Sequence, residues 1–220
     1  MEEEINARLV NRKEAWAQAK RGLTEEGIPP DTRNRASRLP PGQHTTKGWP
    51  VLDLGIHPTT SLRDWTLTVG GAVAQPLTWT WEDFLQQPQI ASMSDFHCVT
   101  TWSTFDNHWE GVSFRHIMSL ARPLPTVRFV LFSSYDGYTT NLPLEACDDE
   151  DVLLTCKWNA EPLTNEHGGP VRVIVPKRYA WKGAKWVKAI TFAERDKPGF
   201  WEVRGYSNTA LPWEEDRYGY

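Results

Sequence analysis

The sequence has only three cysteines, at positions 98, 147 and 156, and no two of them form a CxxC pair. Their spacing gives neither a zinc site nor a disulfide framework, and their odd number leaves at least one thiol outside any disulfide. A reducing compartment is the simplest setting for such a chain.

The sequence also lacks a long apolar run and a surplus of positive charge. No run reaches the roughly 18 apolar residues of a membrane span. The acidic start at Met1 has no apolar segment behind it, and Arg33-Asn34-Arg35 is not a twin-arginine signal. We therefore expect a cytoplasmic protein without a membrane span. The formal net charge of −4 argues against a general nucleic-acid binder.

Long helical periodicity is scarce, whereas prolines and tryptophans are frequent. The chain has 220 residues with sixteen prolines and twelve tryptophans, and proline breaks helices and cannot donate to a β-ladder. This length suits one sizeable core. We predict an α+β, β-dominated mixed single domain over residues 38–220. Residues 1–37 are predicted to form a polar helix, at 2–27, and an extension.

Local patterns predict the elements of this domain. Apolar alternation and β-branched residues indicate strands at 65–69, 127–132, 152–158, 171–175 and 187–192. Short helices are expected at 80–85, with Thr80 as N-cap, at 113–121 and at 141–146. Gly70 and Gly71 are expected to turn the chain. Residues 28–58 are expected to wrap the core and contribute to a site, and residues 200–220 to fold back over the body.

Cys98 stands at the centre of an aromatic stretch from Asp95 to Gly111. A thiol in an apolar frame suits a soft metal ligand, and it equally suits a buried structural cysteine, which this stretch alone favours. A nucleophilic Cys98 activated by His97 is a weaker interpretation, because neighbours on an extended strand point to opposite faces.

A second stretch, residues 167–188, carries six Lys or Arg, and no acidic residue occurs between Glu166 and Glu194. This pattern indicates a local positive field for an anionic ligand. Gly183 and Ala184 allow backbone N–H groups to approach a phosphate, Lys182 and Lys185 supply charge, and Arg172 can clamp an oxyanion. A solvated basic face is the more common meaning of such a run, and the interleaved aromatic rings also suit single-stranded nucleic acid as a minority reading.

Taken in order, seven motifs resemble the sulfite-oxidase-type molybdopterin-binding domain, in its short bacterial branch related to the catalytic subunit of protein-methionine-sulfoxide reductase. Each motif is weak alone, whereas the ordered set, running from about residue 38 to the end, is specific. The motifs lie at 40–43 (PPGQ), 96–103 (FHCVTTWS), 109–112 (WEGV), 137–144 (GYTTNLPL), 167–172 (HGGPVR), 179–186 (YAWKGAKW) and 198–202 (PGFWE).

The resemblance implies a molybdenum atom held by the dithiolene sulfurs of molybdopterin and by one protein thiolate, Cys98. Tungsten is not excluded, because the same donors suit it. Family positions that contact the cofactor fall on His167, Arg172, Gly183, Ala184 and Lys185, and Lys182 lies in the same motif. Ser134, or alternatively Ser133, is similar to a hydroxyl residue near the cofactor. His97 adjoins the ligand, and Trp102 is expected to wall the pocket.

Departures from the family pattern bear on the substrate. Sulfite oxidases carry arginines shortly after the ligating cysteine, whereas residues 99–102 here are Val-Thr-Thr-Trp. Relatives in the short branch often have a basic residue where Thr101 stands, and an acidic one where Leu211 stands. The resemblance therefore implies a small S- or N-oxide-type substrate rather than sulfite.

We expect a monomeric molybdenum-dependent oxidoreductase that transfers an oxygen atom to or from such a substrate. The sequence contains no haem domain, so we expect a separate electron-transfer partner. The alternative is a non-catalytic protein that binds or carries the cofactor.

Overall fold

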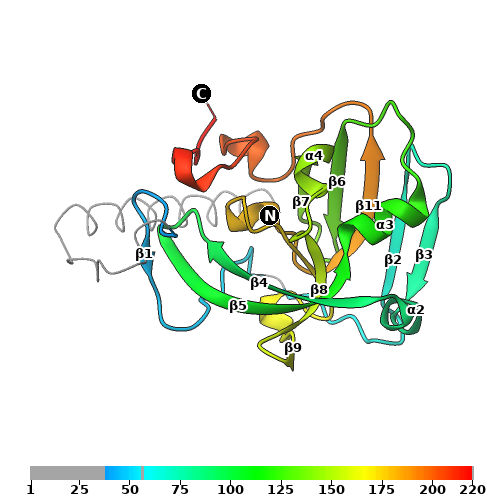
Figure 1. Cartoon of the computed structure of the whole chain (residues 1–220), viewed down its shortest axis with the longest axis horizontal. Coiled ribbons are helices and arrows are strands. Elements are labelled where there is room, and N and C mark those ends of the chain that lie inside the picture. The colour runs from blue at the N-terminus through cyan, green and yellow to red at the C-terminus, as the bar shows by residue number, and fades with distance from the viewer. Residues whose placement is uncertain (1–37, 56, 220) are drawn as a thin grey trace.

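In the computed structural model, which describes residues 38–55 and 57–219, two long antiparallel strands organise the first sheet. They are β4 (Gln89–His97) and β5 (Trp102–Ser113). β8 (Leu153–Trp158) pairs with β5, and β10 (Arg172–Ile174) pairs with β8. The short strands β1 (His44–Thr45) and β9 (Glu161–Pro162) pair with β5 and β8. Figure 1 shows β4 and β5 as a long curved ribbon.

A second sheet stands beside the first and has five strands among the described residues. Its order is β3 (Leu77–Thr80), β2 (Thr66–Gly71), β11 (Val187–Ala193), β6 (Phe129–Ser134) and β7 (Thr139–Pro143). The central pair β2 and β11 is parallel, and the other pairs are antiparallel. Gly71 ends β2 at a φ of 85°, and a Cβ there would lie 2.2 Å from the carbonyl oxygen of Phe192. Only glycine fits this position.

Short helices join the strands. α2 (Trp81–Gln86) begins at the predicted cap, where Thr80 and Asp83 form a capping box. α3 (Phe114–Ala121) buries Phe114, Ile117 and Ala121, and its Phe114 ring contacts Phe132 and Phe192 of the second sheet. α4 (Leu144–Cys147) and the single 3₁₀ turns η1 (Asn165–His167), η2 (Ala180–Lys182), η3 (Glu202–Arg204) and η4 (Pro212–Glu214) complete the connections.

Most of the predicted elements are confirmed, including the β-dominated α+β class. Two expectations are wrong. Residues 141–143 belong to strand β7, because Leu142 pairs with Val130 of β6, and only the segment from Leu144 is helical. Gly70 and Gly71 are not a turn, because β2 runs through both. The predicted helix at 2–27 lies outside the described residues.

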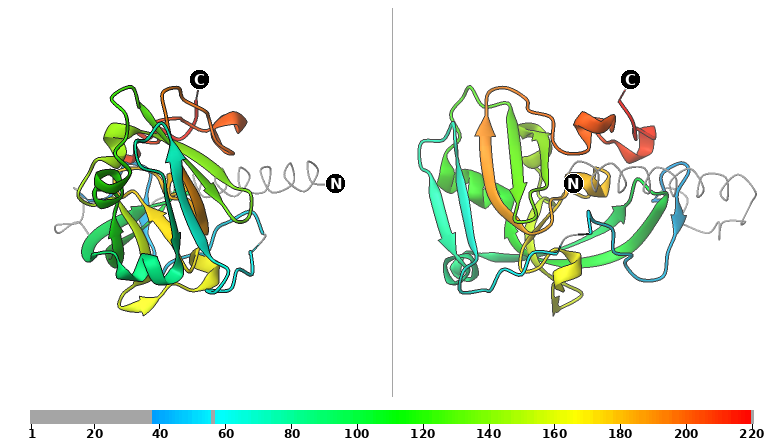
Figure 2. Two further views of the ribbon diagram at one scale, coloured as in Figure 1. Left: turned by 90° about the vertical axis from the view of Figure 1, so that its right-hand side faces the viewer. Right: turned by 180° about the vertical axis from the view of Figure 1, so that it is seen from behind.

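The C-terminal segment folds back over the body, as predicted (Figures 1 and 2). The backbone N–H of Tyr179 donates to the carbonyl of Ala210. The Nη1 atom of Arg217 donates to the carbonyl of Val99 at 2.6 Å. This second contact ties the tail to the loop that follows Cys98. Within the described part of the chain, no helix is long and apolar enough to cross a membrane.

Candidate functional site

Cys98 lies at the start of the short loop that joins β4 to β5. Its N–H donates to the carbonyl of Trp102, and its own carbonyl accepts the N–H of Thr101. Thr101 adopts a φ of 70°, which is costly for a β-branched residue and therefore needs support from its surroundings. The side chain of Cys98 is 6% exposed, and its Sγ lies 3.1 Å from the Oγ1 of Thr100.

Three further contacts hold this loop from outside the hairpin. The Nε2 of Gln43 donates to the carbonyl of Cys98 at 3.1 Å. The N–H of His44 donates to the carbonyl of Thr101, and Arg217 donates to that of Val99. Because these donors come from both ends of the described chain, the position of the Cys98 sulfur depends on the complete fold.

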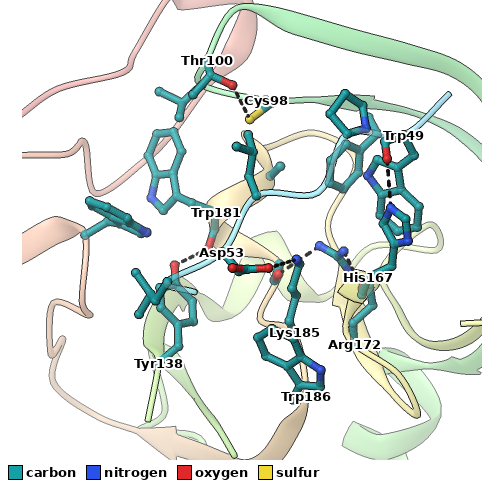
Figure 3. A pocket seen from close by; sticks show the side chains of 18 of the residues that line it. Trp49, Asp53, Cys98, Thr100, Tyr138, His167, Arg172, Trp181, Lys185 and Trp186 are labelled. Atoms are coloured by element: carbon teal, nitrogen blue, oxygen red, sulfur yellow. Dashed lines mark hydrogen bonds and ion pairs between the residues drawn. The ribbon is translucent and has the colours of Figure 1, made fainter. Parts of the chain in front are cut away.

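The Cys98 sulfur faces a pocket that the two sheets and the tail line together (Figure 3). The pocket contains about 790 Å³ of space free of protein atoms, part of which is open to solvent. Its walls are mainly aromatic and apolar, with a few charged groups. The aromatic lining residues are Trp49, Phe96, Trp102, Tyr138, Trp181, Trp186, Trp201 and Tyr206.

Arg172 is the principal cation of this pocket. It is 3% exposed, and its guanidinium lies over the rings of Trp49 and Phe96, at 4.9 and 5.4 Å from their centroids. Two backbone carbonyls, those of His167 and Gly183, accept from it. Among the described residues no carboxylate pairs with Arg172, and its buried Nε has no hydrogen-bond partner. Burial accordingly lowers the pKa of Arg172 to about 9.

A strap, defined as residues 49–54, crosses the pocket and contacts its polar groups. In Figure 3 it carries Asp53 toward Lys185, and their Oδ2 and Nζ atoms lie 3.4 Å apart. His57 also pairs with Asp53, at 2.8 Å. Burial raises the pKa of Asp53, but the N–H of Gly55 and the charges of Lys185 and His57 outweigh burial, so the pKa is lowered overall. Asp53 is therefore ionised at neutral pH.

His167 contacts the other end of the strap. Its ring stacks on Trp49 with a centroid distance of 4.2 Å, and its Nε2 lies 2.9 Å from the Trp49 carbonyl. A carbonyl accepts only, so Nε2 carries a proton and donates. The hydroxyl of Thr164 lies 2.9 Å from Nδ1. Since both ring nitrogens are engaged by the protein, His167 offers the pocket its ring rather than a free hydrogen-bonding atom.

A single thiol, a buried guanidinium and aromatic walls are together suited to an anionic, planar ligand. The described residues contain no group of three or more His, Cys, Asp or Glu placed to hold a metal ion. A metal at Cys98 would thus need its remaining donors from a bound group.

The model of the oxidoreductase molybdopterin binding domain matches residues 54–201. The chain belongs to this family. Its members are enzymes that use molybdopterin with molybdenum.

Two curated relatives show how far the likeness extends. The chain is 40% identical over 186 residues to the uncharacterized oxidoreductase YuiH of Bacillus subtilis, covering 84% of this chain and 94% of that protein. It is 27% identical over 157 residues to the protein-methionine-sulfoxide reductase catalytic subunit MsrP of Campylobacter jejuni, covering 64% of this chain and 52% of that one.

A solved structure also resembles the fold. The sulfane dehydrogenase SoxCD of Paracoccus pantotrophus matches with a TM-score of 0.60 and 22% identity, over 68% of this chain and 42% of that one. At this identity the likeness shows a shared fold alone.

The structure brings together five of the nine site residues that the sequence analysis named. Cys98, His167, Arg172, Gly183 and Lys185 line the pocket, as does the predicted wall residue Trp102. Gly183 is required by packing, because a Cβ there would lie 2.5 Å from the carbonyl oxygen of Val173.

The other four named residues do not line the pocket. His97 is buried on the opposite side of β4, where its Nδ1 contacts Ser103 and its ring meets Trp213. Ser134 and Ala184 are fully buried behind the walls. The Nζ of Lys182 pairs with the Oε1 of Glu202 at 2.6 Å, and both side chains are almost wholly buried. Lys182 therefore neutralises a protein carboxylate.

Three of the six cations in the basic stretch 167–188 are paired with carboxylates. Lys177 pairs with Asp149, Lys182 with Glu202 and Lys185 with Asp53. The acidic partners come from other parts of the chain, so the absence of acids within 167–188 does not leave these three lysines without carboxylates.

Several lining residues were not anticipated from the sequence. They include Thr100 beside the sulfur, Asp53 on the strap, and Asp136 and Tyr138 after β6. The predicted contribution of residues 28–58 did point to the strap region. Tyr138 lies in the motif at 137–144, but the motif assigned it no place in the pocket, and Asp136 lies outside every motif; both reach the pocket through the pairing of β6 with β11.

Proposed function

We propose that this protein is a molybdopterin-dependent oxidoreductase in which the Cys98 thiolate ligates the molybdenum. The reaction transfers an oxygen atom to or from a small S- or N-oxide-type substrate. Reduction of such an oxide consumes two electrons and two protons and releases water. The bound cofactor supplies the two-electron oxygen-transfer chemistry, and the chain's own residues hold it, orient it and restrict water.

One observation carries this proposal: a buried thiol and a buried guanidinium without a carboxylate open onto the same aromatic pocket. A buried charge is costly unless it is compensated. An anionic cofactor would compensate Arg172, and its orphan Nε would gain an acceptor. The residues present therefore fit the group that the family uses.

The charge around Cys98 supports an uncharged oxide rather than sulfite. Residues 99–102 contain no cation. The guanidinium of Arg217 does approach this loop, but it donates to the Val99 carbonyl and does not line the pocket. With Arg172 compensating the cofactor and Lys185 paired with Asp53, residues 99–102 would offer a dianionic substrate no further cation. Val99, Trp181 and Trp201 would accommodate an apolar substituent.

A separate electron-transfer partner belongs to the same proposal. The relative from Campylobacter jejuni is named as a catalytic subunit, which supports a divided system. We further propose a cytoplasmic monomer. The absence of disulfides among the three cysteines supports a reducing setting.

The proposal is tested by elemental analysis for molybdenum and tungsten on protein made in a cofactor-competent host. The wild type is expected to carry near-stoichiometric metal, and Cys98→Ser to lose the metal or to change its electronic spectrum. Cys156→Ser is the matched control, because Cys156 is also 6% exposed but does not line the pocket. It should keep both metal and spectrum.

The loaded wild type is then screened with sulfoxides and N-oxides under a chemical electron donor. Turnover of any of these oxides supports the proposed enzymatic activity. Stoichiometric metal without redox cycling on any oxide would instead favour a cofactor-binding or carrier protein. A folded wild type that takes up no metal in the competent host contradicts the proposal.

A further inference from the structure

We propose that Thr100 is a positioning residue for the metal's thiolate, donating a hydrogen bond to the Cys98 sulfur that raises the reduction potential of the metal. This inference rests on the proposed function, because it requires Cys98 to be the metal ligand. The family resemblance assigns no role to Thr100, although Thr100 lies within the motif at 96–103.

The geometry places this hydroxyl at the sulfur. The Oγ1 of Thr100 lies 3.1 Å from the Cys98 Sγ, and Thr100 is 1% exposed. Both residues line the pocket, so the contact sits where the metal would be bound. Figure 3 shows the hydroxyl directed at the sulfur.

The loop holds this contact in place without help from the cofactor. Gln43 binds the Cys98 carbonyl, Arg217 binds the Val99 carbonyl, and His44 binds the Thr101 carbonyl. These contacts stabilise the turn through Thr101 at its positive φ. The backbone on both sides of Thr100 is therefore fixed, and little entropy remains to be lost when its hydroxyl binds the sulfur.

Ionisation of the sulfur fixes the direction of the hydrogen bond. In a thiol either atom can donate, whereas a thiolate has no proton and can only accept. A metal-bound Cys98 would therefore receive the Thr100 proton. A hydrogen bond to a ligating sulfur withdraws electron density from the metal–sulfur bond, which stabilises the reduced metal and raises its potential.

The test compares Thr100→Val, Thr100→Ser and Thr101→Val, each purified with its cofactor, matched for metal content and titrated potentiometrically. Thr100→Val is expected to shift the potential downward and the sulfur-to-metal charge-transfer band to longer wavelength. Thr100→Ser keeps the hydroxyl and should keep both values. Thr101→Val is the matched control, because the buried Thr101 hydroxyl has no hydrogen-bond partner among the described residues. It should leave the potential unchanged.

The outcomes separate this inference from the proposed function. Fully loaded Thr100→Val with the wild-type potential and band overturns the role of Thr100 and leaves the role of Cys98 intact. A Cys98→Ser variant with the wild-type band overturns the proposed function itself. If Thr100→Val fails to bind metal while Thr100→Ser binds it normally, the result supports the hydrogen bond from the Thr100 hydroxyl to the metal's thiolate, because only the hydroxyl differs in effect between the two variants. Loss from both variants indicates a steric role and overturns the proposal.

Discussion

The buried charge of Arg172 lowers the stability of the cofactor-free fold but favours binding of an anionic ligand. Its guanidinium is buried with two backbone carbonyls and no carboxylate around it, so the fold tolerates a charge that a bound anion would compensate. The sequence identified this residue as a cation on a strand within the basic stretch 167–188 and as a matching position in the family resemblance. It could not identify the burial, which depends on the rings of Trp49 and Phe96.

Replacing Arg172 with Met should therefore affect the cofactor-bound protein far more than the cofactor-free protein. We expect cofactor binding to weaken by about tenfold to a hundredfold, the effect of losing one charge-assisted hydrogen bond. Cofactor retained after dialysis and the melting temperature of both forms provide the measurement. Arg115→Met, at an exposed ion pair with Asp148, is the control. Equal losses in the two forms would contradict this view of Arg172.

Lys182 shows the limit of sequence reasoning at the residue scale. Its neighbours Gly183 and Lys185 do line the pocket, but Lys182 points away and pairs with Glu202. The same carboxylate accepts the indole N–H of Trp181, so the pair also orients one wall of the pocket. No pattern in the sequence near Lys182 predicts that its side chain pairs with Glu202, twenty positions later.

Among the elements, those with strong local signals were predictable and the central hairpin was not. The capping box of α2, the periodicity of α3 and the β-branched run at β10 are all local. β4 and β5 contain polar residues that are satisfied only after folding: the amide of Asn107 and the indole of Trp109 both bind Ser94. Their alternation is therefore weak in the sequence.

The strap is held at both ends: His167 contacts Trp49 at one end, and the ion pair of Asp53 with Lys185 holds the other. Asp53→Asn should weaken its hold on Lys185, and the amides of residues 49–54 in the cofactor-free protein should exchange about threefold to tenfold faster. Hydrogen exchange read by mass spectrometry measures this. Asp64→Asn, which removes an exposed carboxylate bonded to Ser61, should leave the strap unchanged.

The pH dependence of the strap follows from the same pair. The lowered pKa of Asp53 means that the pair is fully formed above the ordinary carboxylate pKa of about 4 and is lost only as the pH falls through the lower, folded value. Strap protection should thus be equal at pH 7 and pH 5. Strap exchange that is the same in wild type and Asp53→Asn would contradict the attachment.

At the scale of the whole molecule, the pocket joins parts that are otherwise separate. Cys98 and Arg172 come from the first sheet, Asp136 and Lys185 from ends of second-sheet strands, and Tyr206 from the tail. A ligand bound there would stabilise all three together. The β-dominated class was predictable from the strand patterns, whereas this meeting of sheets and tail required the tertiary structure.

Removing the cofactor should therefore lower the melting temperature of the entire domain in one transition. Saturation at a hundred times the dissociation constant adds about 2.7 kcal/mol, or roughly 5 to 10 °C for a chain of this size. Calorimetry on loaded and cofactor-free protein gives the difference. The coupling would be contradicted if loaded and cofactor-free protein had identical melting curves. It would also be contradicted if the loaded protein unfolded in two transitions, with one part of the domain melting early.

Because β2 pairs in parallel with β11, the second sheet can be completed only late in the synthesis of the chain. Thr68 finds its partner Ala189 only when most of the chain has left the ribosome, and the wall residue Tyr206 follows later still. Contacts of such long sequence separation form slowly. A nascent chain thus has no complete pocket to load, and insertion of the cofactor becomes a post-translational step whose timing is dictated by the last strand and the tail.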